Sequence, residues 1–249
     1  MSVDDYLHRK ADSGKAHLTL IDPDEQSPST AGAMARQAER AGTDGIMIGG
    51  STAEDQEVVH RTVEAVKDAC DLPAILFPGG VQGLSDRADA IFYISLLNSS
   101  DPYFITGAHA ASAHRIRELG LEVIPVGYIV VEPGQTVGRL GKANLIPQED
   151  PGLASSYALA AQFMGMRYVY LEAGSGASHH VPEDMISRTK ESISIPLIVG
   201  GGIRTVDDAE RVAGSGADIL VQGTVLEEDG EASRNLARVI EKLRLSGGA

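Results

Sequence analysis

The sequence contains a single cysteine, Cys70, so it has no pair of thiols for an internal disulfide. We expect Cys70 to fill a small space in the core and the compartment to be a reducing cytoplasm. No run of about 18 apolar residues occurs, which argues against a transmembrane helix. Residues 1–14 are polar and charged, so no secretory signal is expected.

Basic residues are also scarce. The chain has 21 Lys and Arg against 35 Asp and Glu, which gives a net charge of −14. This balance argues against nucleic acid and anionic membrane surfaces as partners, because both attract basic patches. Two interpretations of the negative charge remain open. The acidic surface keeps the protein soluble, or it is an adaptation to a high salt concentration inside the cell, where repulsion between the charges is screened.

The chain has 249 residues, of which 43% are hydrophobic, and no flexible linker divides it. We therefore expect one domain spanning residues 1–249. Several apolar, β-branched runs lack alternation, as expected for parallel strands that are covered on both sides. The eight predicted strands span residues 16–21, 45–48, 74–77, 90–95, 122–131, 168–172, 196–199 and 218–222. Helices are predicted over residues 29–41, 54–69, 108–119, 155–164, 182–192, 206–213 and 231–245.

Four of these helices end in the same way, with a glycine two or three residues before the next strand. These glycines are Gly42, Gly120, Gly165 and Gly216. A glycine helix cap followed by a short turn is typical of strand–helix–strand units. Eight strands that mostly alternate with helices favour a closed (β/α)8 barrel, of the α/β class, over an open doubly wound sheet.

The third unit of this barrel is too short. Only residues 78–89, three of them glycine, separate the third and fourth strands. A crossover with a helix and two loops usually needs more residues. We expect a modified TIM barrel that lacks its third helix and leaves an apolar slot in the wall. A very short helix with tight loops is the alternative.

Glycines and small polar residues follow several predicted strands at their carboxyl ends, where active sites of such barrels lie. Glycine lets backbone N–H groups approach an anion closely, and a following helix N-terminus adds positive potential. Three such clusters end the sixth, seventh and eighth strands and predict a phosphate site: Gly174-Ser175-Gly176, Gly201-Gly202 and Gly223-Thr224.

Carboxylates follow the first strand in Ile21-Asp22-Pro23-Asp24. Hard oxygen ligands at a strand end suit Mg²⁺, which often bridges substrate phosphates. Asp22 is the stronger candidate ligand, and Ser51, which follows Gly49-Gly50, is a weaker one. An Asx turn around Pro23 explains Asp22 equally well, and a helix cap explains Ser51.

Glu172 ends the sixth strand within an otherwise apolar run. A buried charge costs free energy unless it is paired or functional. We favour a general base that accepts a proton from a substrate hydroxyl, and an internal salt bridge is the alternative. Arg204 is a candidate partner for the phosphate or a carboxylate. His179 and His180 are interpreted as loop histidines, since adjacent residues rarely converge on one metal ion.

Together these motifs resemble the geranylgeranylglyceryl phosphate synthase family, and the resemblance spans nearly the whole chain. The motifs are HLTLIDPD at 17–24, IGGST at 48–52, FPGG at 77–80, LNS at 97–99, GYIVVEPG at 127–134, YLEAGSGA at 170–177 and GGGIR at 200–204. The AGSG form after Glu172 resembles the second of the two sequence groups of this family. One residue departs from that group: Glu25 stands where a lysine often follows Asp-Pro-Asp, which weakens the support for a metal at Asp22.

The resemblance implies a fold, a reaction and a site. The fold is a TIM barrel without its third helix. The reaction joins sn-glycerol 1-phosphate to an all-trans polyprenyl diphosphate and releases diphosphate, in the synthesis of archaeal-type ether lipids. By resemblance, Asp22 and Ser51 bind Mg²⁺ and Glu172 is the base. The residues implied for binding glycerol phosphate are Tyr170, Leu171, Glu172, Ala173, Gly174, Ser175, Gly176, Gly201, Gly202, Gly223 and Thr224.

The prenyl tail needs a long apolar groove, and the slot left by the short third unit is the candidate. Its expected lining includes Tyr93, Ile94, Leu96 and Leu97, which are equally compatible with a place in the core. The family forms dimers and, in the second group, often hexamers, so a homo-oligomer is expected. The aromatic pair Tyr103 and Phe104 suits such a contact if it is exposed. The sequence does not specify the length of the prenyl chain.

Two other function classes remain open at this point. The first is another phosphate-handling barrel, such as an isomerase or aldolase. A Schiff-base enzyme needs a lysine at a strand end, and Lys15, Lys142 and Lys190 lie elsewhere. The second is a barrel without catalytic activity that binds a phosphorylated metabolite and regulates a partner.

Overall fold

Eight parallel strands pair in sequence order and close into a barrel, with β8 beside β1. The barrel class predicted from the sequence is therefore confirmed. The strands are β1 (Ala16–Ile21), β2 (Gly45–Ile48), β3 (Ala74–Leu76), β4 (Ala90–Leu96), β5 (Glu122–Val130), β6 (Tyr168–Glu172), β7 (Leu197–Gly200) and β8 (Ile219–Gln222). Each lies within about two residues of its predicted bounds, because buried apolar runs between turn residues are a strong strand signal.

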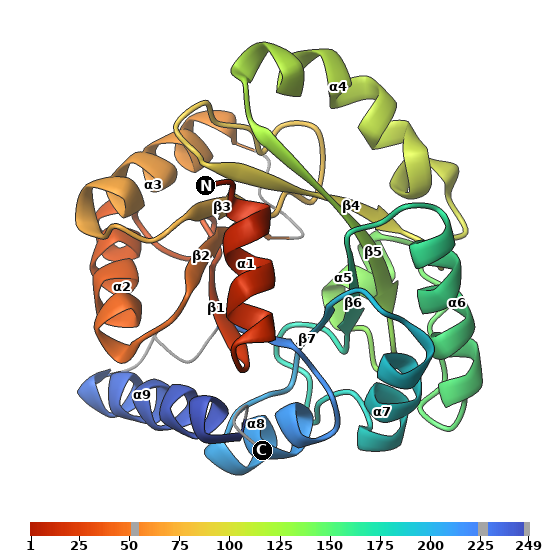
Figure 1. Ribbon diagram of the computed structural model, residues 1–249. Coiled ribbons are helices and arrows are strands. Elements are labelled where there is room, and N and C mark those ends of the chain that lie inside the picture. The colour runs from red at the N-terminus through yellow and green to blue at the C-terminus, as the bar shows by residue number, and fades with distance from the viewer. Residues whose placement is uncertain (51–54, 224–228, 247–249) are drawn as a thin grey trace.

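The computed structural model describes residues 1–50, 55–223 and 229–246. The helices are α1 (Val3–Asp12), α2 (Pro28–Ala41), α3 (Gln56–Ala69), α4 (Ala108–Leu119), α5 (Gln135–Leu140), α6 (Pro151–Phe163), α7 (Glu183–Ser192), α8 (Val206–Gly214) and α9 (Asp229–Ser246), with a π-helix, η1 (Tyr103–Gly107), before α4. Most of them form a ring around the barrel, whereas α1 lies across one end of it (Figure 1). The sequence analysis did not predict α1, η1 or α5. No helix in the described part of the chain is long and apolar enough to cross a membrane.

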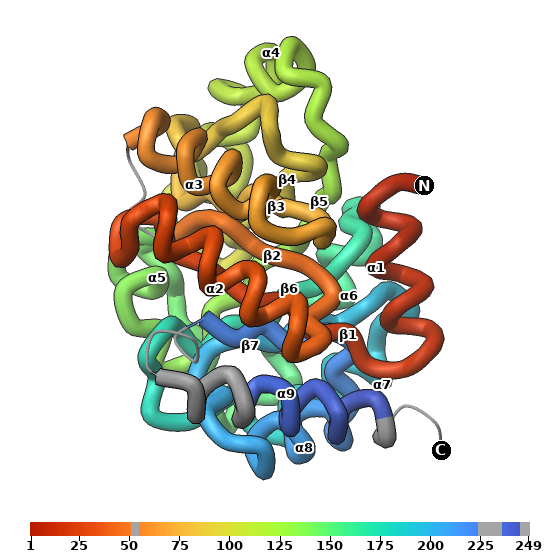
Figure 2. Tube along the Cα trace, turned by 90° about the vertical axis from the view of Figure 1, so that its left-hand side faces the viewer, coloured from red at the N-terminus to blue at the C-terminus, as the bar shows by residue number. Residues whose placement is uncertain are grey.

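The third crossover has no helix. Residues 77–89, all of which the structure describes, connect β3 to β4 through turns and irregular backbone. This confirms the expected departure from a regular TIM barrel. The two ends of the barrel are clearly distinguished in Figure 2, where α1 lies at one end and α5 at the other. Since α1 precedes β1 and α5 follows β5, the α5 end carries the carboxyl ends of the strands.

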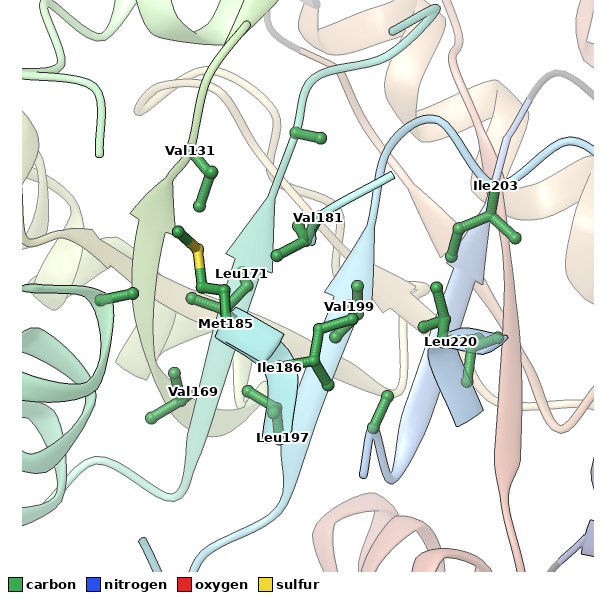
Figure 3. Packing of buried hydrophobic residues seen from close by; sticks show 14 of the residues in the cluster. Val131, Val169, Leu171, Val181, Met185, Ile186, Leu197, Val199, Ile203 and Leu220 are labelled. Carbon is green, nitrogen blue, oxygen red and sulfur yellow. The ribbon is translucent and has the colours of Figure 1, made fainter. Parts of the chain in front are cut away.

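The core has an inner and an outer layer. Alternate strand residues such as Leu18, Phe92 and Tyr168 fill the barrel interior, and Leu7 of α1 packs against them. The strand residues between these face outward, toward the helices, because successive side chains of a strand point to opposite faces. Figure 3 shows the outer layer behind β6 to β8, where Leu171 and Val199 meet Met185 and Ile186 of α7. Cys70 is buried at the end of α3, as expected.

Local sequence signals account for the helix ends. Ser27 caps the N-terminus of α2 ahead of Pro28, and Thr205 forms a capping box with Asp208 at the start of α8. Gly42 ends α2 with φ of 99°, a left-handed conformation that favours glycine. These residues fix where each helix begins and ends, and so where the loops that follow the strands can lie.

One bond pattern recurs at the amino end of the barrel. The Asp218 carboxylate precedes β8, accepts the Leu197 backbone N–H at 2.7 Å and pairs with Lys190 at 2.6 Å. The same arrangement occurs at Asp44 with His17 and Lys10, and at Asp89 with Ala74 and Lys67. Three aspartates therefore tie neighbouring strands and helices together at the amino end of the barrel. Residues at this end of such barrels usually serve stability, because the active site lies at the carboxyl ends of the strands.

Candidate active site

Glu172 lies at the carboxyl end of β6 and its residue is only 7% exposed. One carboxylate oxygen accepts the backbone N–H of Gly174 at 2.6 Å. The hydroxyl groups of Tyr128 and Tyr170 also hydrogen-bond to this carboxylate. None of the ion pairs among the described residues involves Glu172, so the structure does not support an internal salt bridge there.

The environment of Glu172 suits a base. Burial raises the pKa of its carboxyl, since removal from water disfavours the charged form, and the three hydrogen bonds partly offset that rise. Burial and the nearby Glu172 charge raise the pKa values of Tyr128 and Tyr170 well above their usual range, which keeps both phenols protonated as donors. A carboxylate with a raised pKa and a fixed orientation is well placed to accept a proton from a hydroxyl group.

A first prediction concerns the pH dependence of this base. A Tyr128→Phe substitution removes a donor that stabilises the charged form of Glu172, so the pKa of Glu172 should rise further. A base acts when deprotonated, and the acid limb of the kcat/KM profile should therefore move to higher pH. Tyr157→Phe, on α6, is the control. If the acid limb of Tyr128→Phe stays at its wild-type pH, Tyr128 does not influence the pKa of the catalytic base.

The loops after β6 and β7 meet directly above Glu172. A side chain at Gly201 would collide with the Glu172 carboxylate and the backbone of Gly174, so only glycine fits between the two loops. Gly201 also has φ of 81°, which favours glycine. The Arg204 guanidinium donates to the Gly176 carbonyl at 2.9 Å and so ties the two loops together. The structure thus brings two of the three predicted glycine clusters to one place.

The third cluster, at the end of β8, is only partly described. Gly223 follows β8 directly and is half-buried beside Leu20. Because β7 and β8 are paired neighbours, with Gly200 opposite Val221, the β8 tip adjoins the β7 loop. Thr224 lies outside the described residues, so its predicted role in the phosphate site is not addressed by the structure.

Asp22 follows β1, and its carboxylate is half-buried. One oxygen accepts the Asp24 backbone N–H at 3.0 Å, which is the Asx turn considered as an alternative. The carboxylate also lies against Gly50, where a β-carbon would collide with it. Burial raises the pKa of Asp22, and repulsion from Glu25 and Asp24 adds to this effect. No ion pair in the described part of the chain neutralises Asp22.

These features fit a divalent cation held by few protein ligands. A bound cation would offset the repulsion at Asp22, whose carboxylate lies against Gly50 after β2. No group of three or more His, Cys, Asp or Glu among the described residues is arranged to hold a metal. Mg²⁺ commonly binds through one or two carboxylates together with substrate phosphates and water. Ser51, the second predicted ligand, lies outside the residues that the structure describes.

An apolar groove opens in the barrel wall at the missing helix. It is lined by the segment after β3, by β4 and by one face of α4, including Phe77, Tyr93, Ile94 and Leu96. Three of the four predicted lining residues are thus present. Leu97 is not part of the lining, because it follows the end of β4 and packs against the outer layer beside Gly127 of β5. That part of the prediction was wrong.

Tyr103 and Phe104, the aromatic pair considered for an oligomer contact, differ in exposure. Tyr103 is exposed, but Phe104 is half-buried and lines the groove. Only Tyr103 therefore remains available for contact with another molecule. The two histidines of the loop after β6 have local partners: Ser178 and Gln148 for His179, and the Val181 carbonyl for His180. This agrees with their interpretation as loop histidines.

The groove and the polar centre are joined by aromatic rings. Phe77 and Tyr128 both line the groove, and their ring centroids lie 5.7 Å apart. Tyr128 in turn packs edge-on against Tyr170 at 5.0 Å, and both phenols reach Glu172. Gly50, which touches the Asp22 carboxylate, lines the groove as well. One end of the apolar groove therefore adjoins both predicted functional carboxylates.

Sequence reasoning assigned no role to Phe77 or Tyr128. Both lie in motifs that carried the family resemblance, but an aromatic residue in or beside a strand is most often core. The only available signal was the phenol of Tyr128 within an apolar run, since a buried hydroxyl needs a hydrogen-bond partner. That partner, Glu172, is 44 residues away in sequence and becomes apparent only from the pairing of β5 with β6.

The fold and the site together define a class of protein: a (β/α)8 barrel whose glycine-lined polar centre opens onto an apolar groove in its wall. Comparison with known proteins identifies the family. The PcrB family matches residues 8–242, and the chain belongs to this family. The resemblance seen in the sequence is thus confirmed by a match over most of the chain.

Named relatives agree with this assignment. The chain is 50% identical over 245 residues to a geranylgeranylglyceryl phosphate synthase from Thermococcus sibiricus, covering 97% of this chain and 96% of that protein. It is 52% identical over 241 residues to the synthase from Methanothermobacter marburgensis, covering 97% and 98%. Among solved structures, the Thermoplasma acidophilum synthase in complex with sn-glycerol 1-phosphate superposes with a TM-score of 0.95 at 44% identity, covering 98% and 99% of the two chains.

Proposed function

We propose that this protein joins sn-glycerol 1-phosphate to geranylgeranyl diphosphate and releases diphosphate, as the first ether-linking step of archaeal-type membrane lipid synthesis. The observation that carries the proposal is the meeting of the apolar groove with Glu172 through Tyr128. A groove for a prenyl chain that ends at a buried base fits a reaction between an apolar and a polar substrate. The relatives named as geranylgeranylglyceryl phosphate synthases support it.

The glycine loops are proposed to bind the phosphate of sn-glycerol 1-phosphate. Backbone N–H groups of residues 175–176, 201–202 and 223–224 would surround it, since the Gly174 N–H is held by Glu172. Tyr170 and Glu172 would form the wall below, whereas Leu171 and Ala173 face the outer layer and would only support the strand. Such a cradle fixes the position of the glycerol hydroxyl, and orientation of this kind accelerates a reaction without changing intrinsic reactivity. Arg204, already bonded to the Gly176 carbonyl, adds positive charge beside these loops.

The chemistry follows from the position of Glu172. The oxygen of the sn-3 hydroxyl attacks the allylic carbon of the prenyl diphosphate, and the bond from that carbon to diphosphate breaks. Diphosphate leaves with the bonding electrons, while the hydroxyl proton passes to a Glu172 oxygen. The rings of Phe77 and Tyr128 line the groove near this point, and aromatic faces favour nearby positive charge such as that developing on the allylic carbon.

Asp22 and Ser51 are proposed to hold a Mg²⁺ ion together with diphosphate oxygens. When bound, the ion neutralises the negative charge that accumulates on the leaving group. Asp22 supplies the carboxylate and Gly50 leaves it room. Glu25 and Asp24 both repel the Asp22 carboxylate, and a bound cation would offset that repulsion.

The metal proposal yields a second prediction. Asp22→Ala should raise the Mg²⁺ concentration needed for half-maximal activity by about tenfold or more, because losing a charged ligand typically costs more than 1.4 kcal/mol. Asp12→Ala is the control, since Asp12 is an exposed carboxylate on α1, at the opposite end of the barrel. A Mg²⁺ titration of initial rates with both substrates measures the effect. An unaltered Mg²⁺ requirement in Asp22→Ala contradicts the ligand role.

The reaction itself is tested with purified protein, Mg²⁺, radiolabelled sn-glycerol 1-phosphate and geranylgeranyl diphosphate. Radioactivity that becomes extractable into organic solvent supports the transferase. Binding of glycerol phosphate without product would favour the regulatory barrel instead. We expect the protein to be cytoplasmic and to form a dimer or hexamer, and light scattering on the same preparation measures the assembly.

A further inference from the structure

A chain of buried polar side chains lies behind the phosphate loops and has no part in the mechanism above. His17 of β1 is fully buried, and its ring nitrogens lie 2.8 Å from Thr43 Oγ1 and 3.0 Å from Gln222 Oε1. Thr19 donates its hydroxyl to Thr43 at 3.2 Å, and the Gln222 amide donates to the Ile203 carbonyl at 3.0 Å. These side chains face outward from the barrel, since neighbouring strand residues fill its interior.

The directions of these hydrogen bonds follow from the group at which the series ends, the Ile203 carbonyl. The Ile203 carbonyl can only accept, so the amide nitrogen of Gln222 faces it and the amide oxygen faces His17. His17 must then carry its proton on Nε2. Burial lowers the pKa of His17 to about 4, so the ring is neutral and its Nδ1 accepts from the Thr43 hydroxyl.

The series therefore runs one way, from the hydroxyl of Thr19 through Thr43, His17 and Gln222 to the Ile203 carbonyl. His17 and Gln222 each both accept and donate, whereas the single proton of the Thr43 hydroxyl is shared between His17 Nδ1 and the His17 carbonyl at 3.0 Å. A buried network with every group satisfied is rigid, whereas one missing member leaves buried polar atoms unpaired. The series ends next to Gly201-Gly202, the glycines proposed to bind phosphate.

The peptide between Ile203 and Arg204 is fixed at both ends. Gln222 holds its carbonyl, and its N–H donates to the Asp208 carboxylate at 3.1 Å. Asp208 belongs to the capping box of α8, so one end of the peptide is tied to that helix and the other to β8. The conformation of the loop that precedes Ile203 thus depends on the Gln222 bond, which is the last of a series of hydrogen bonds that begins in β1.

We propose that His17 and Gln222 are positioning residues for sn-glycerol 1-phosphate: through the Ile203 carbonyl they hold the loop of Gly201 and Gly202 in its phosphate-binding conformation. The proposal rests on the proposed function, because it concerns the same phosphate site. Pre-organisation of this kind improves affinity by lowering the cost of ordering the loop on binding. It acts on one substrate only, since neither residue lines the prenyl groove.

The test uses Gln222→Met, which keeps the length of the side chain but removes both polar ends, and Thr43→Val, which breaks the series two members earlier. Thr43→Ser keeps the hydroxyl and is the conservative rescue. Thr189→Val is the matched control, because the Thr189 hydroxyl is also buried but has no partner. Calorimetric titration with sn-glycerol 1-phosphate gives Kd, steady-state kinetics give KM for each substrate, and thermal unfolding reports that each variant is folded.

Gln222→Met should raise Kd and KM for sn-glycerol 1-phosphate about tenfold, equivalent to about 1.4 kcal/mol, and Thr43→Val should raise them less. KM for the prenyl diphosphate should stay unchanged, Thr43→Ser should restore binding, and Thr189→Val should bind normally. A merely structural network would lower the unfolding temperature without this selective loss.

Folded Gln222→Met and Thr43→Val with wild-type Kd would overturn the positioning role and leave the proposed function standing. If Gln222→Met does not fold, the contrast between Thr43→Val and Thr43→Ser decides. A wild-type protein that binds no sn-glycerol 1-phosphate would overturn both proposals together.

Discussion

Glu172→Gln is expected to lower kcat by a factor on the order of 10³, within the range that a general base supplies. An amide of the same shape cannot accept the proton of the glycerol hydroxyl. Its oxygen can still accept the Gly174 N–H, so the loop after β6 should keep its conformation. Calorimetric titration of the variant with sn-glycerol 1-phosphate should therefore give a Kd close to that of the wild type.

The matched control is Glu191→Gln, which neutralises an exposed carboxylate on α7. Both variants change the net charge equally, so only the position of the acid differs. Near-normal turnover in Glu172→Gln would remove Glu172 as the base. Loss of both turnover and sn-glycerol 1-phosphate binding would instead assign it to substrate binding, with the proton passing elsewhere.

Ser112→Trp is expected to prevent long prenyl chains from entering the groove. Ala108, Ser112 and Ile116 line the groove from one face of α4 at spacings of four residues, and Ser112 is the middle of the three. An indole there fills space that the chain needs. If overpacking by the indole costs the bound complex roughly 1–3 kcal/mol, kcat/KM with geranylgeranyl diphosphate should fall about 5- to 150-fold.

Comparison of prenyl diphosphates of different lengths separates this effect from misfolding. Short chains that end before Ser112 should react nearly as well as in the wild type. Ala113→Trp is the control, because Ala113 is the next residue of α4 and is exposed. Equal losses for short and long chains in Ser112→Trp, or no loss for either, would mean that the prenyl chain does not run along α4.

The barrel was predictable from the sequence for physical reasons. Strands covered on both sides must be apolar, and glycines such as Gly42 mark the ends of the helices between them, so the strands and most helices stood out. Helix α1 was missed because Leu7 is its only buried residue, which leaves almost no apolar period. Helix α5 has six residues, too few to show a helical period.

The site was less predictable, and the residues that were missed explain why. Glu172 stood out because a charge within an apolar strand is costly. Tyr128 did not, because its hydrogen bond to Glu172 depends on the pairing of strands. Leu97 was misassigned to the groove because a sequence run does not show that this residue packs beside Gly127 of the neighbouring strand β5. The series from Thr19 to Gln222 joins residues about 200 positions apart along the chain, which sequence spacing alone cannot indicate.

The central claim is that the tips of β6, β7 and β8 hold one phosphate beside Glu172. A crystal structure with sn-glycerol 1-phosphate tests it most directly. The account predicts the phosphate between residues 174–176 and 201–202, with the free glycerol hydroxyl within hydrogen-bond distance of the Glu172 carboxylate and facing the groove at Tyr128. A phosphate bound elsewhere, or a glycerol hydroxyl turned away from Glu172, would contradict it.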